Sequence, residues 1–412
     1  AWNMSARYNK RNLFTDGLQA NVLVSHTWEH SVTIDTTYRK YQWDGNYIES
    51  SRNEITGRAK QLRHYKRPLT ITRINLDYQL NEQHAFNVNY MLHRNGNRRY
   101  DKIDNDFSPS KDLLSKHIIG ISYSQLLFQE KMANNFFIKN YINHAKIEQT
   151  DLSWITHSDK IPNKTTENNL GYGIGTRYIF FEPFALKLSY EHAIRLPMAK
   201  ELLGNGNTIY PNLALKPESS DNYNAGLFGY IHPDKQHSIS YEANAFFRKV
   251  KDYIHAVLSQ SDGTIQYENV SDVNIKGLEG EIRYLYNNRL QCMINCSYQD
   301  SRNMNKFKQD GKPSIIYKNK IPNTPWLYGN GEITFTQPDF FCKTDKLRLS
   351  YLYQYIHWFY LTWEGYGSLE TNTRIPTQHF HSAVISYSLK NDRYNIALEC
   401  NNLFDSKLYD NY

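Results

Sequence analysis

The chain has 412 residues, of which 40% are hydrophobic, a mean hydropathy of −0.69 and a formal net charge of +7. No stretch approaches the roughly 18 consecutive apolar residues that a spanning helix needs, which excludes an α-helical membrane protein. The basic residues are dispersed and concentrate in expected loops such as 52–67, so they indicate no nucleic-acid partner. The 33 Tyr, 19 Phe and 7 Trp are more informative, because transmembrane β-barrels carry aromatic girdles while their average hydropathy resembles that of soluble proteins.

Apolar and polar side chains alternate along the chain from its first residues. The even positions of 2–8 are apolar and the odd positions between them are polar. Segment 73–80 repeats this pattern without interruption, and the same period of two returns at 239–247, 290–299, 347–353 and 394–401. Such a sustained period predicts antiparallel strands that present one apolar and one polar face.

The connections between these strands alternate in length. Short turns are expected at 81–83, 129–133, 182–183, 232–236, 287–289, 337–346 and 390–392. Long polar loops are expected at 41–70, 94–116, 148–169, 196–220, 301–325 and 362–378. The seven short turns imply fourteen strands, and 2–38 adds a pair, which gives about sixteen. Short turns at one end and long loops at the other are typical of outer-membrane barrels and unexpected for a soluble sandwich. We therefore predict an all-β fold, a transmembrane antiparallel up-and-down β-barrel.

The sequence offers no constellation for catalysis or for a metal or other cofactor. Cys292 and Cys296 would lie about 13 Å apart along one strand, too far for a disulfide. The histidines are scattered without ligand spacing, and nothing resembles a nucleophile beside a positioned base. We expect neither an enzyme nor a cofactor.

Four groups of short motifs follow one another in the second half of the chain. They are IRLP at 194–197, YPNLALKPE at 210–218 followed by DNYNAGL at 221–227, YENV and IKGLEGE at 267–270 and 275–281, and IPNTP at 321–325 with NNLFD at 401–405. In this order they resemble the motifs of TonB-dependent outer-membrane receptors. Residues 1–190 carry no such motif and agree only through their strand pattern. A glycine within the third group, Gly277, suits a bulge or a close backbone approach.

The resemblance implies a signal peptide, a TonB-contacting segment and a plug domain, followed by a barrel of about 22 strands that the plug fills. The start at 1–4 lacks the features of a secretory signal. We therefore expect 1–412 to be a barrel fragment of about sixteen strands, without the plug, some N-terminal strands and the closing strand. Ligand would bind at the extracellular loops, and the TonB complex would pull on the plug.

The expected function is energised import of a scarce nutrient across the bacterial outer membrane. The candidates are a ferric siderophore, haem, cobalamin or a glycan. In some haem receptors a histidine lies between the first two motifs, and 198–210 contains none. The alternatives are a passive sixteen-stranded porin and a starch-utilisation-type glycan importer, which would pair with a surface lipoprotein.

Six residues are candidates for ligand contact. Arg195, Tyr210 and Asn212 come from the first two motifs, and Trp358, Tyr360 and Trp363 come from an aromatic segment at 355–366 that could stack on a planar or sugar ligand. The alternative for Arg195 is a structural role at the barrel rim, and for the aromatic residues it is the extracellular girdle. Basic residues at 52–67 could attract an anionic ligand or lipopolysaccharide phosphates, or form a solvated loop.

Overall fold

The computed structural model describes residues 1–37, 40–41, 44–48, 60–104, 109–147, 164–204, 209–258, 265–307, 311–364, 374–407 and 409. Its strands are β1 (Trp2–Lys10), β2 (Leu18–Asp35), β3 (Lys40–Tyr41), β4 (Tyr47–Ile48), β5 (Gln61–Gln79), β6 (His84–Asp101), β7 (Ser110–Leu127), β8 (Met132–Lys146), β9 (Lys164–Phe181), β10 (Phe184–Arg195), β11 (Ile209–Tyr210), β12 (Glu218–Ile231), β13 (His237–Leu258), β14 (Ile265–Tyr286), β15 (Leu290–Asn303), β16 (Leu327–Pro338), β17 (Lys346–Ile356), β18 (Phe359–Tyr360), β19 (Arg374–Ile375), β20 (Gln378–Leu389) and β21 (Tyr394–Cys400). One short helix, α1 (Ala199–Leu203), lies between β10 and β11. The described helix is too short to cross a membrane.

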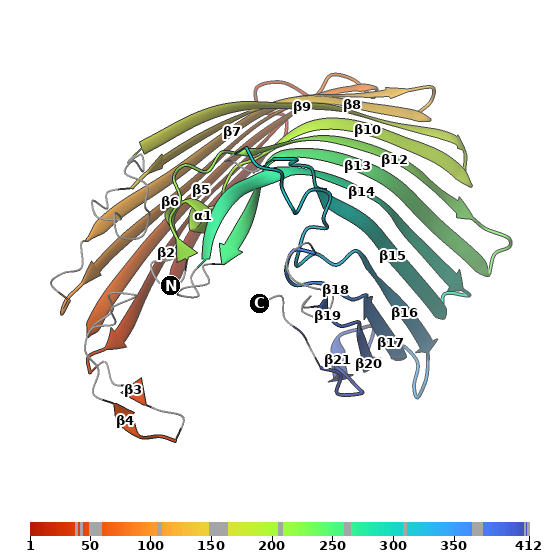
Figure 1. Cartoon of the computed structure of the whole chain (residues 1–412). Coiled ribbons are helices and arrows are strands. Elements are labelled where there is room, and N and C mark those ends of the chain that lie inside the picture. The colour runs from red at the N-terminus through yellow and green to blue at the C-terminus, as the bar shows by residue number, and fades with distance from the viewer. Residues whose placement is uncertain are drawn as a thin grey trace.

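The main sheet contains 17 strands. All but β11 follow one another in chain order with antiparallel neighbours, from β1 through β2, β5 and onward to β20 and β21. The two-residue β11 instead pairs in parallel with β14. The meander confirms the predicted antiparallel all-β architecture and its sixteen principal strands, which is the 17 less β11. The sheet curves into a barrel-like wall, with the first and last strands on the two sides of an opening (Figure 1).

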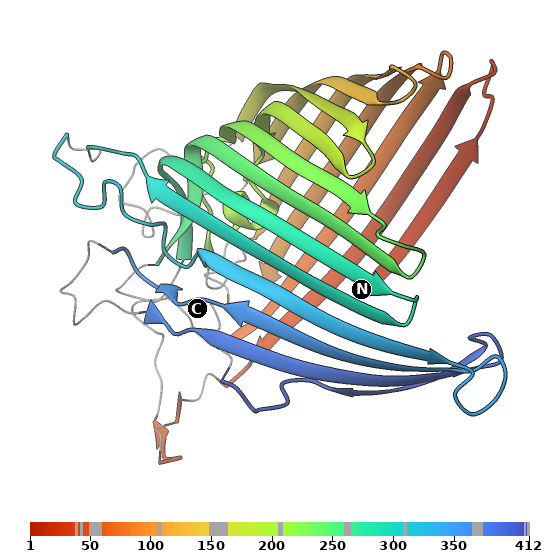
Figure 2. The ribbon, with the colours of Figure 1, turned by 90° about the vertical axis from the view of Figure 1, so that its right-hand side faces the viewer.

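The two ends of the sheet differ as the sequence predicts. One end carries short turns, including two residues between β9 and β10 and three between β14 and β15, whereas long segments leave the other end (Figure 2). The strands, however, extend well into the expected loops. β5 begins at Gln61 and β6 ends at Asp101, although 41–70 and 94–116 were expected to be loops. Backbone pairing continues where the apolar alternation stops, because a strand outside the lipid needs no apolar face.

The β13–β14 hairpin is the tallest feature of the sheet. Each strand has 22 residues, and pairing continues past register shifts at Val250 and Tyr253 up to Leu258 and Ile265. The expected loops did not include this hairpin's tip. Its upper part lies beside the inward-folded residues 196–204 and 209–217, whose helix α1 Figure 1 shows on the concave side of the sheet.

The two faces of the sheet have opposite chemistry. Large apolar side chains such as Leu278, Ile282 and Ile294 are more than half exposed on the convex face. The residues between them, for example Glu279, Glu281 and Asn295, point into the lumen with the other polar rows. Apolar side chains left in the open on a regular alternating pattern are expected where lipid replaces water outside the wall.

Gly277 confirms the expected close approach of backbone and side chain. A Cβ atom at Gly277 would overlap the carbonyl oxygen of Tyr298 and the ring of Phe246. The register is regular at this position, and the irregularity of the hairpin lies instead at 250–254. Glycine is therefore required here by the packing of the lumen-facing Phe246 and by the neighbouring strand.

Candidate ligand site at the loop end of the sheet

Arg195, the last residue of β10, is held by two carboxylates. Its Nη1 and Nη2 donate to Oε2 and Oε1 of Glu201 at 3.1 and 2.7 Å. Its Nε lies 3.6 Å from Oε2 of Glu218, which faces Arg195 across the β10–β12 pair. The side chain of Glu201 is only 2% exposed. The planar guanidinium thus forms a bidentate ion pair that neutralises a buried carboxylate.

Helix α1 places Glu201 beside Arg195. The backbone N–H of Met198 donates to Oε2 of Glu201 at 2.7 Å, which closes the first turn. Proline at 197 ends β10 because it has no N–H to donate to the ladder. On the helix, Leu202 and Leu203 are buried in an apolar cluster, whose other members are Leu114, Ala145, Ile147, Leu213, Leu215 and Ile254. This cluster packs residues 199–203 and 213–215 against β7, β8 and β13.

The side chain of Asn212 connects the same segment to the β13–β14 hairpin through a hydrogen bond. Its Nδ2 donates to the carbonyl oxygen of Tyr267 in β14 at 2.8 Å. Its Oδ1 accepts the backbone N–H of Ala214 at 3.0 Å, and its own N–H donates to the carbonyl oxygen of Leu202 at 3.0 Å. Three hydrogen bonds therefore connect Asn212 to helix α1, to its own turn and to β14.

Tyr210 lies in β11, two residues before Asn212. Ile209 and Tyr210 pair in parallel with Ile265 and Gln266 of β14. Nε2 of Gln266 also donates to the carbonyl oxygen of Pro211 at 3.1 Å. The structure therefore places Tyr210 and Asn212 in one inward-folded segment, the loop unit of residues 196–204 and 209–217, with Arg195 at its start. The described contacts of these three residues are with neighbouring chain segments.

Trp358 and Tyr360 form part of an aromatic cluster near the upper ends of β15 to β17. Their rings are 5.4 Å apart in an edge-to-face arrangement. The guanidinium of Arg374 lies 4.5 Å from the Trp358 centroid and 5.4 Å from that of Tyr360. Trp326 lies 5.9 Å from Trp358 and carries the ammonium of Lys320 at 4.3 Å. Cations thus cover ring faces that a stacking ligand would use.

Trp363 belongs to different surroundings. Its ring lies 6.2 Å from that of His255 in β13, and it packs against a cluster of Val250, Val273 and Ile321. In the described part of the chain, no ring contact joins Trp363 to Trp358. The tall hairpin therefore contacts both predicted groups, the loop unit through β14 and Trp363 through β13.

Glu364 connects the aromatic cluster to the loop before β16. Its Oε2 accepts the backbone N–H of Lys320 at 3.3 Å, and its Oε1 accepts the hydroxyl of Tyr360 at 3.4 Å. Burial lowers the pKa of the Lys320 ammonium below its ordinary value. The lowered pKa agrees with a lysine that lies over the Trp326 ring instead of in open water.

The basic segment is only partly described, because Arg52 and Arg58 lie outside the described residues. Nε of Arg63 lies 3.5 Å from Oδ2 of Asp101. Nη1 of Arg67 lies 2.9 Å from Oε1 of Glu29. Both arginines therefore form ion pairs with carboxylates of neighbouring strands, and neither is an unpaired cation that could bind an anionic ligand.

Sequence patterns missed several residues of the site. Glu201 and Arg374 were not candidates, although Glu201 contacts Arg195 and Arg374 contacts Trp358 and Tyr360. Lys320 was not a candidate either, and it lies over Trp326, a ring neighbour of Trp358. Glu218 could have been predicted. It ends the YPNLALKPE motif, which follows the motif of Arg195 in the chain, and a carboxylate in such a position suggests an ion pair with the arginine. Over the ranges that the structure describes, no three His, Cys, Asp or Glu residues are placed to hold a metal ion, and the four cysteines are unpaired.

Residues 1–403 match the family model described as TonB dependent receptor-like, beta-barrel. The chain therefore belongs to the TonB-dependent receptor family, whose members are outer-membrane β-barrels, and the match lies in the barrel part. The motifs at 194–197, 210–218 and 321–325 had indicated this family. No curated protein matches the chain.

Solved structures share this fold at low sequence identity. The copper transporter OprC has a TM-score of 0.73 and 14% identity over 99% of this chain and 60% of its own. The FrpB iron transporter from Neisseria meningitidis gives 0.66 and 15%, over 98% and 58%. BauA, the ferric preacinetobactin receptor from Acinetobacter baumannii, gives 0.60 and 11%, over 95% and 56%. The chain spans at most 60% of the length of these three structures.

Proposed function

We propose that this chain is the barrel wall of a receptor in the bacterial outer membrane that imports a scarce nutrient with energy from the TonB complex. The family match over 1–403 is the observation that carries the proposal. The segregation of the two faces supports it, because an apolar convex face suits lipid and a polar concave face suits a plug and a hydrated ligand. We further propose that 1–412 constitutes one barrel domain and that a separate plug contacts TonB.

For the ligand, we propose a small metal chelate, with a ferric siderophore as the leading candidate. The solved structures of this fold are named as transporters or receptors for copper, iron and ferric preacinetobactin. Import of such chelates needs no chemistry from the wall. Haem, cobalamin and glycans are the competing ligands.

A glycan importer with a surface lipoprotein partner is the weaker alternative. Sugar recognition by stacking needs an accessible aromatic face. Arg374 lies over Trp358 and Tyr360, and Lys320 lies over Trp326. These cations would have to leave before a sugar ring could stack on the same faces.

The six predicted residues receive different roles in this proposal. Arg195, Tyr210 and Asn212 would fix the conformation of the inward loop. The ligand and the apex of the plug would contact this loop. Trp363 would contact the ligand or the plug, because it lies on the lumen side of the hairpin. Trp358 and Tyr360, with Arg374, would present a combined cationic and aromatic surface, which suits an anionic aromatic chelate better than a neutral sugar.

The ligand proposal is tested by growth of a strain that lacks the native gene and carries the full-length receptor. Iron, copper, haem, cobalamin and glycans are limited in turn, and ferric chelates of known composition are supplied as the iron source. We expect rescue by a ferric chelate and a severalfold loss of uptake in Trp363→Ala, with Trp2→Ala on the convex face as the matched control. Rescue only by a glycan would overturn the metal-chelate assignment.

A further inference from the structure

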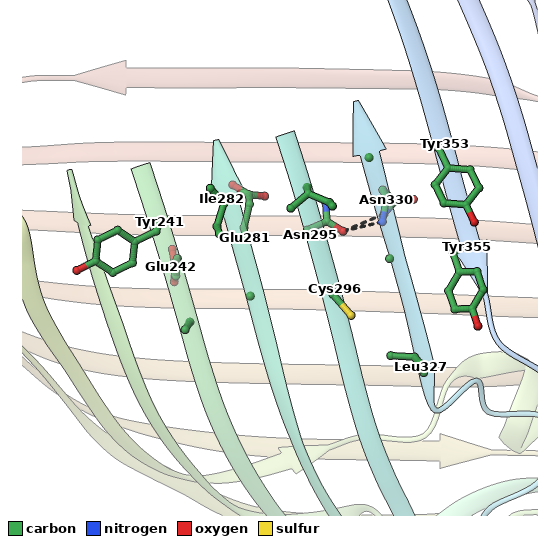
Figure 3. Close-up of a pocket in the computed structure, with 15 residues that line it drawn as sticks. Tyr241, Glu242, Glu281, Ile282, Asn295, Cys296, Leu327, Asn330, Tyr353 and Tyr355 are labelled. Atoms are coloured by element: carbon green, nitrogen blue, oxygen red, sulfur yellow. Dashed lines mark hydrogen bonds between the residues drawn. The ribbon is translucent and has the colours of Figure 1, made fainter. Parts of the chain in front are cut away.

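A groove of about 640 Å³ crosses the convex face of β13 to β17 (Figure 3). Its floor is a row of small residues in register on four neighbouring strands. Ala243 lies opposite Gly280, Gly280 opposite Cys296, and Cys296 opposite Gly329. Gly331 extends the floor one pair further along β16. Large apolar residues occupy most of the rest of this face, so the groove is a local interruption of the apolar band.

Tyrosines and isoleucines form the borders of this groove. Figure 3 shows Tyr241 on one side and Tyr353 and Tyr355 on the other, with Ile282 between them. Ile282 and Ile294 are 53% and 62% exposed, so apolar surface is open toward the outside of the wall. The exposed lining of the groove is apolar, which suits a hydrocarbon chain better than a polar solute.

Packing within the sheet does not require two of the floor glycines. A Cβ at Gly280 would lie 3.7 Å from the carbonyl oxygen of Glu242, and one at Gly331 would lie 4.0 Å from that of Met293. Both distances are ordinary contacts, in contrast to Gly329, where a Cβ would overlap the carbonyl oxygen of Asn295. Glycine in a strand interior weakens the strand. Gly280 and Gly331 therefore leave the groove open, although the packing of the sheet would accept a larger residue at either position and glycine lowers the stability of the strand.

The depth of the groove places it inside the apolar band. Gly280 lies six residues above Tyr286, the last residue of β14 at the short-turn end. Six residues rise about 20 Å along the strand, which a tilt of 35–45° reduces to about 15 Å of height. By the same arithmetic Lys276 lies about 25 Å above that end, which is the height of the apolar band. A lysine thus stands at the upper border of the lipid directly above the groove.

Several cations share this upper border on the convex face. The Lys276 side chain is 69% exposed, and its Nζ lies 3.9 Å from Oδ2 of Asp300. Arg302 donates to the same carboxylate at 2.9 Å, and Lys249 is exposed on the next strand. Asp221 lies opposite Lys249 on β12, so three cations share this border with two carboxylates, and a net positive charge remains. An anionic headgroup above the groove would be electrostatically favoured there.

We propose that the groove seats an acyl chain of a phosphorylated membrane lipid, whose phosphate lies near Lys276 and Lys249. This inference rests on the proposed location in the outer membrane, and it is independent of the imported ligand. Apolar contacts along the chain and a cation at the headgroup would together favour one lipid at a fixed place on the wall.

The test measures retention of lipid A by the full-length receptor in a non-ionic detergent, using native mass spectrometry. The double variant Gly280→Leu/Gly331→Leu fills the groove, and Ala6→Leu on the convex face of β1 is the matched control. We expect one lipid A per wild-type or control molecule. Filling the groove should lower retention about tenfold or more, because acyl binding weakens with every CH₂ group that is kept from packing against the wall. Lys249→Gln/Lys276→Gln should remove the preference for lipid A over phosphatidylethanolamine.

Equal retention by the groove-filled and control variants would overturn the inference. So would a wild-type receptor that forms dimers and becomes monomeric in Gly280→Leu/Gly331→Leu, because the groove would then seat a second copy. Uptake of the nutrient is measured in the same variants. Normal uptake without site-specific lipid retention would contradict only the groove assignment, whereas lost TonB dependence in the wild type would contradict the proposed function.

Discussion

Arg195 and Glu201 lie six residues apart, and they form a two-pronged ion pair across the junction between the last wall residue of β10 and the inward loop. Glu201 is buried, whereas the Arg195 side chain is 39% exposed. The arginine motif of this family is therefore used here to satisfy a carboxylate inside the loop unit. This ion pair adds to the apolar cluster around Leu202 and Leu203 and to the hydrogen bonds of Asn212, which hold the same loop unit.

Replacing Arg195 with alanine should loosen segment 196–217. Breaking a buried pair costs about 3 kcal/mol or more, and the exposure of Arg195 reduces the expected loss to about 2 kcal/mol. Limited proteolysis of the folded receptor and urea unfolding measure this change. Arg283→Ala is the control, because its pair with Glu281 is more exposed. Equal protease resistance of the two variants would contradict the structural role of Arg195.

Charge on the convex face should be costly. Ile121 is 51% exposed on β7, six residues from the strand's lower end, whereas the next residue, Ser122, faces the lumen. Ile121→Arg should lose about 2 to 4 kcal/mol of folding free energy in lipid vesicles, and Ser122→Arg should lose much less. The folded fraction can be read from the mobility of unheated protein in gel electrophoresis. The opposite ranking would mean that the two faces are assigned the wrong way round.

Two lumen-facing glycines should respond differently to alanine. A Cβ at Gly277 overlaps Tyr298 and Phe246, whereas a Cβ at Gly175 has its nearest contact at 3.9 Å, with Ser189. Gly277→Ala should destabilise the barrel by about 1 to 3 kcal/mol through overpacking. Gly175→Ala should be neutral or stabilising by up to about 1 kcal/mol. Equal unfolding midpoints for the two variants in urea would show that β14 can relax around the added methyl.

The turn between β16 and β17 should loosen in acid. Burial alone would raise the pKa of Asp345, but hydrogen bonds from the Tyr387 hydroxyl and from the N–H groups of Phe341, Cys342 and Phe340 bring it well below its ordinary value. A carboxylate with a lowered folded pKa contributes its full stability above its unfolded pKa of about 3.9. That contribution begins to decline as pH falls below about 4, and it is fully lost only when pH has passed the lowered folded pKa.

Amide hydrogen exchange in this turn measures the acid effect, after correction for the intrinsic pH dependence of exchange. Protection of the three amides should fall below about pH 4 in the wild type. In Asp345→Asn the protection should be weaker at neutral pH and should lack the acid transition. Asp392→Asn is the control, because Asp392 lies in the turn between β20 and β21 and binds Lys346, the neighbour of Asp345, without accepting from the three amides. An acid transition that survives in Asp345→Asn would assign it to another group.

The strands were predictable because alternate residues face lipid and lumen, and the lipid-facing ones are apolar whereas the lumen-facing ones are polar. Segment 73–80 shows this in β5, where Ile74 and Leu76 face outward and Asn75 and Asp77 face inward. The upper parts of β5, β6 and the β13–β14 hairpin were not predictable, because strands above the lipid lose the apolar face that reveals them. Backbone pairing alone leaves little trace in the sequence.

The candidate site was only partly predictable. Motifs identified Arg195 and Asn212, but the partner of Arg195 depends on a five-residue helix whose buried Glu201 belongs to no motif. Aromatic clustering identified Trp358 and Trp363, but their separation into two environments depends on the fold, which places Trp363 beside His255 of a distant strand. Two residues that are close in the sequence of one loop can therefore contact different strands of the sheet.

The most direct measurement of the central claim is uptake of a radiolabelled ferric chelate by cells carrying the full-length receptor, with and without a functional TonB. We predict saturable uptake that requires TonB and is lost when the receptor gene is deleted. Small solutes such as sugars should not leak through the receptor in either strain. Uptake that is unchanged without TonB, with passage of unrelated small solutes, would contradict active import and identify a passive porin.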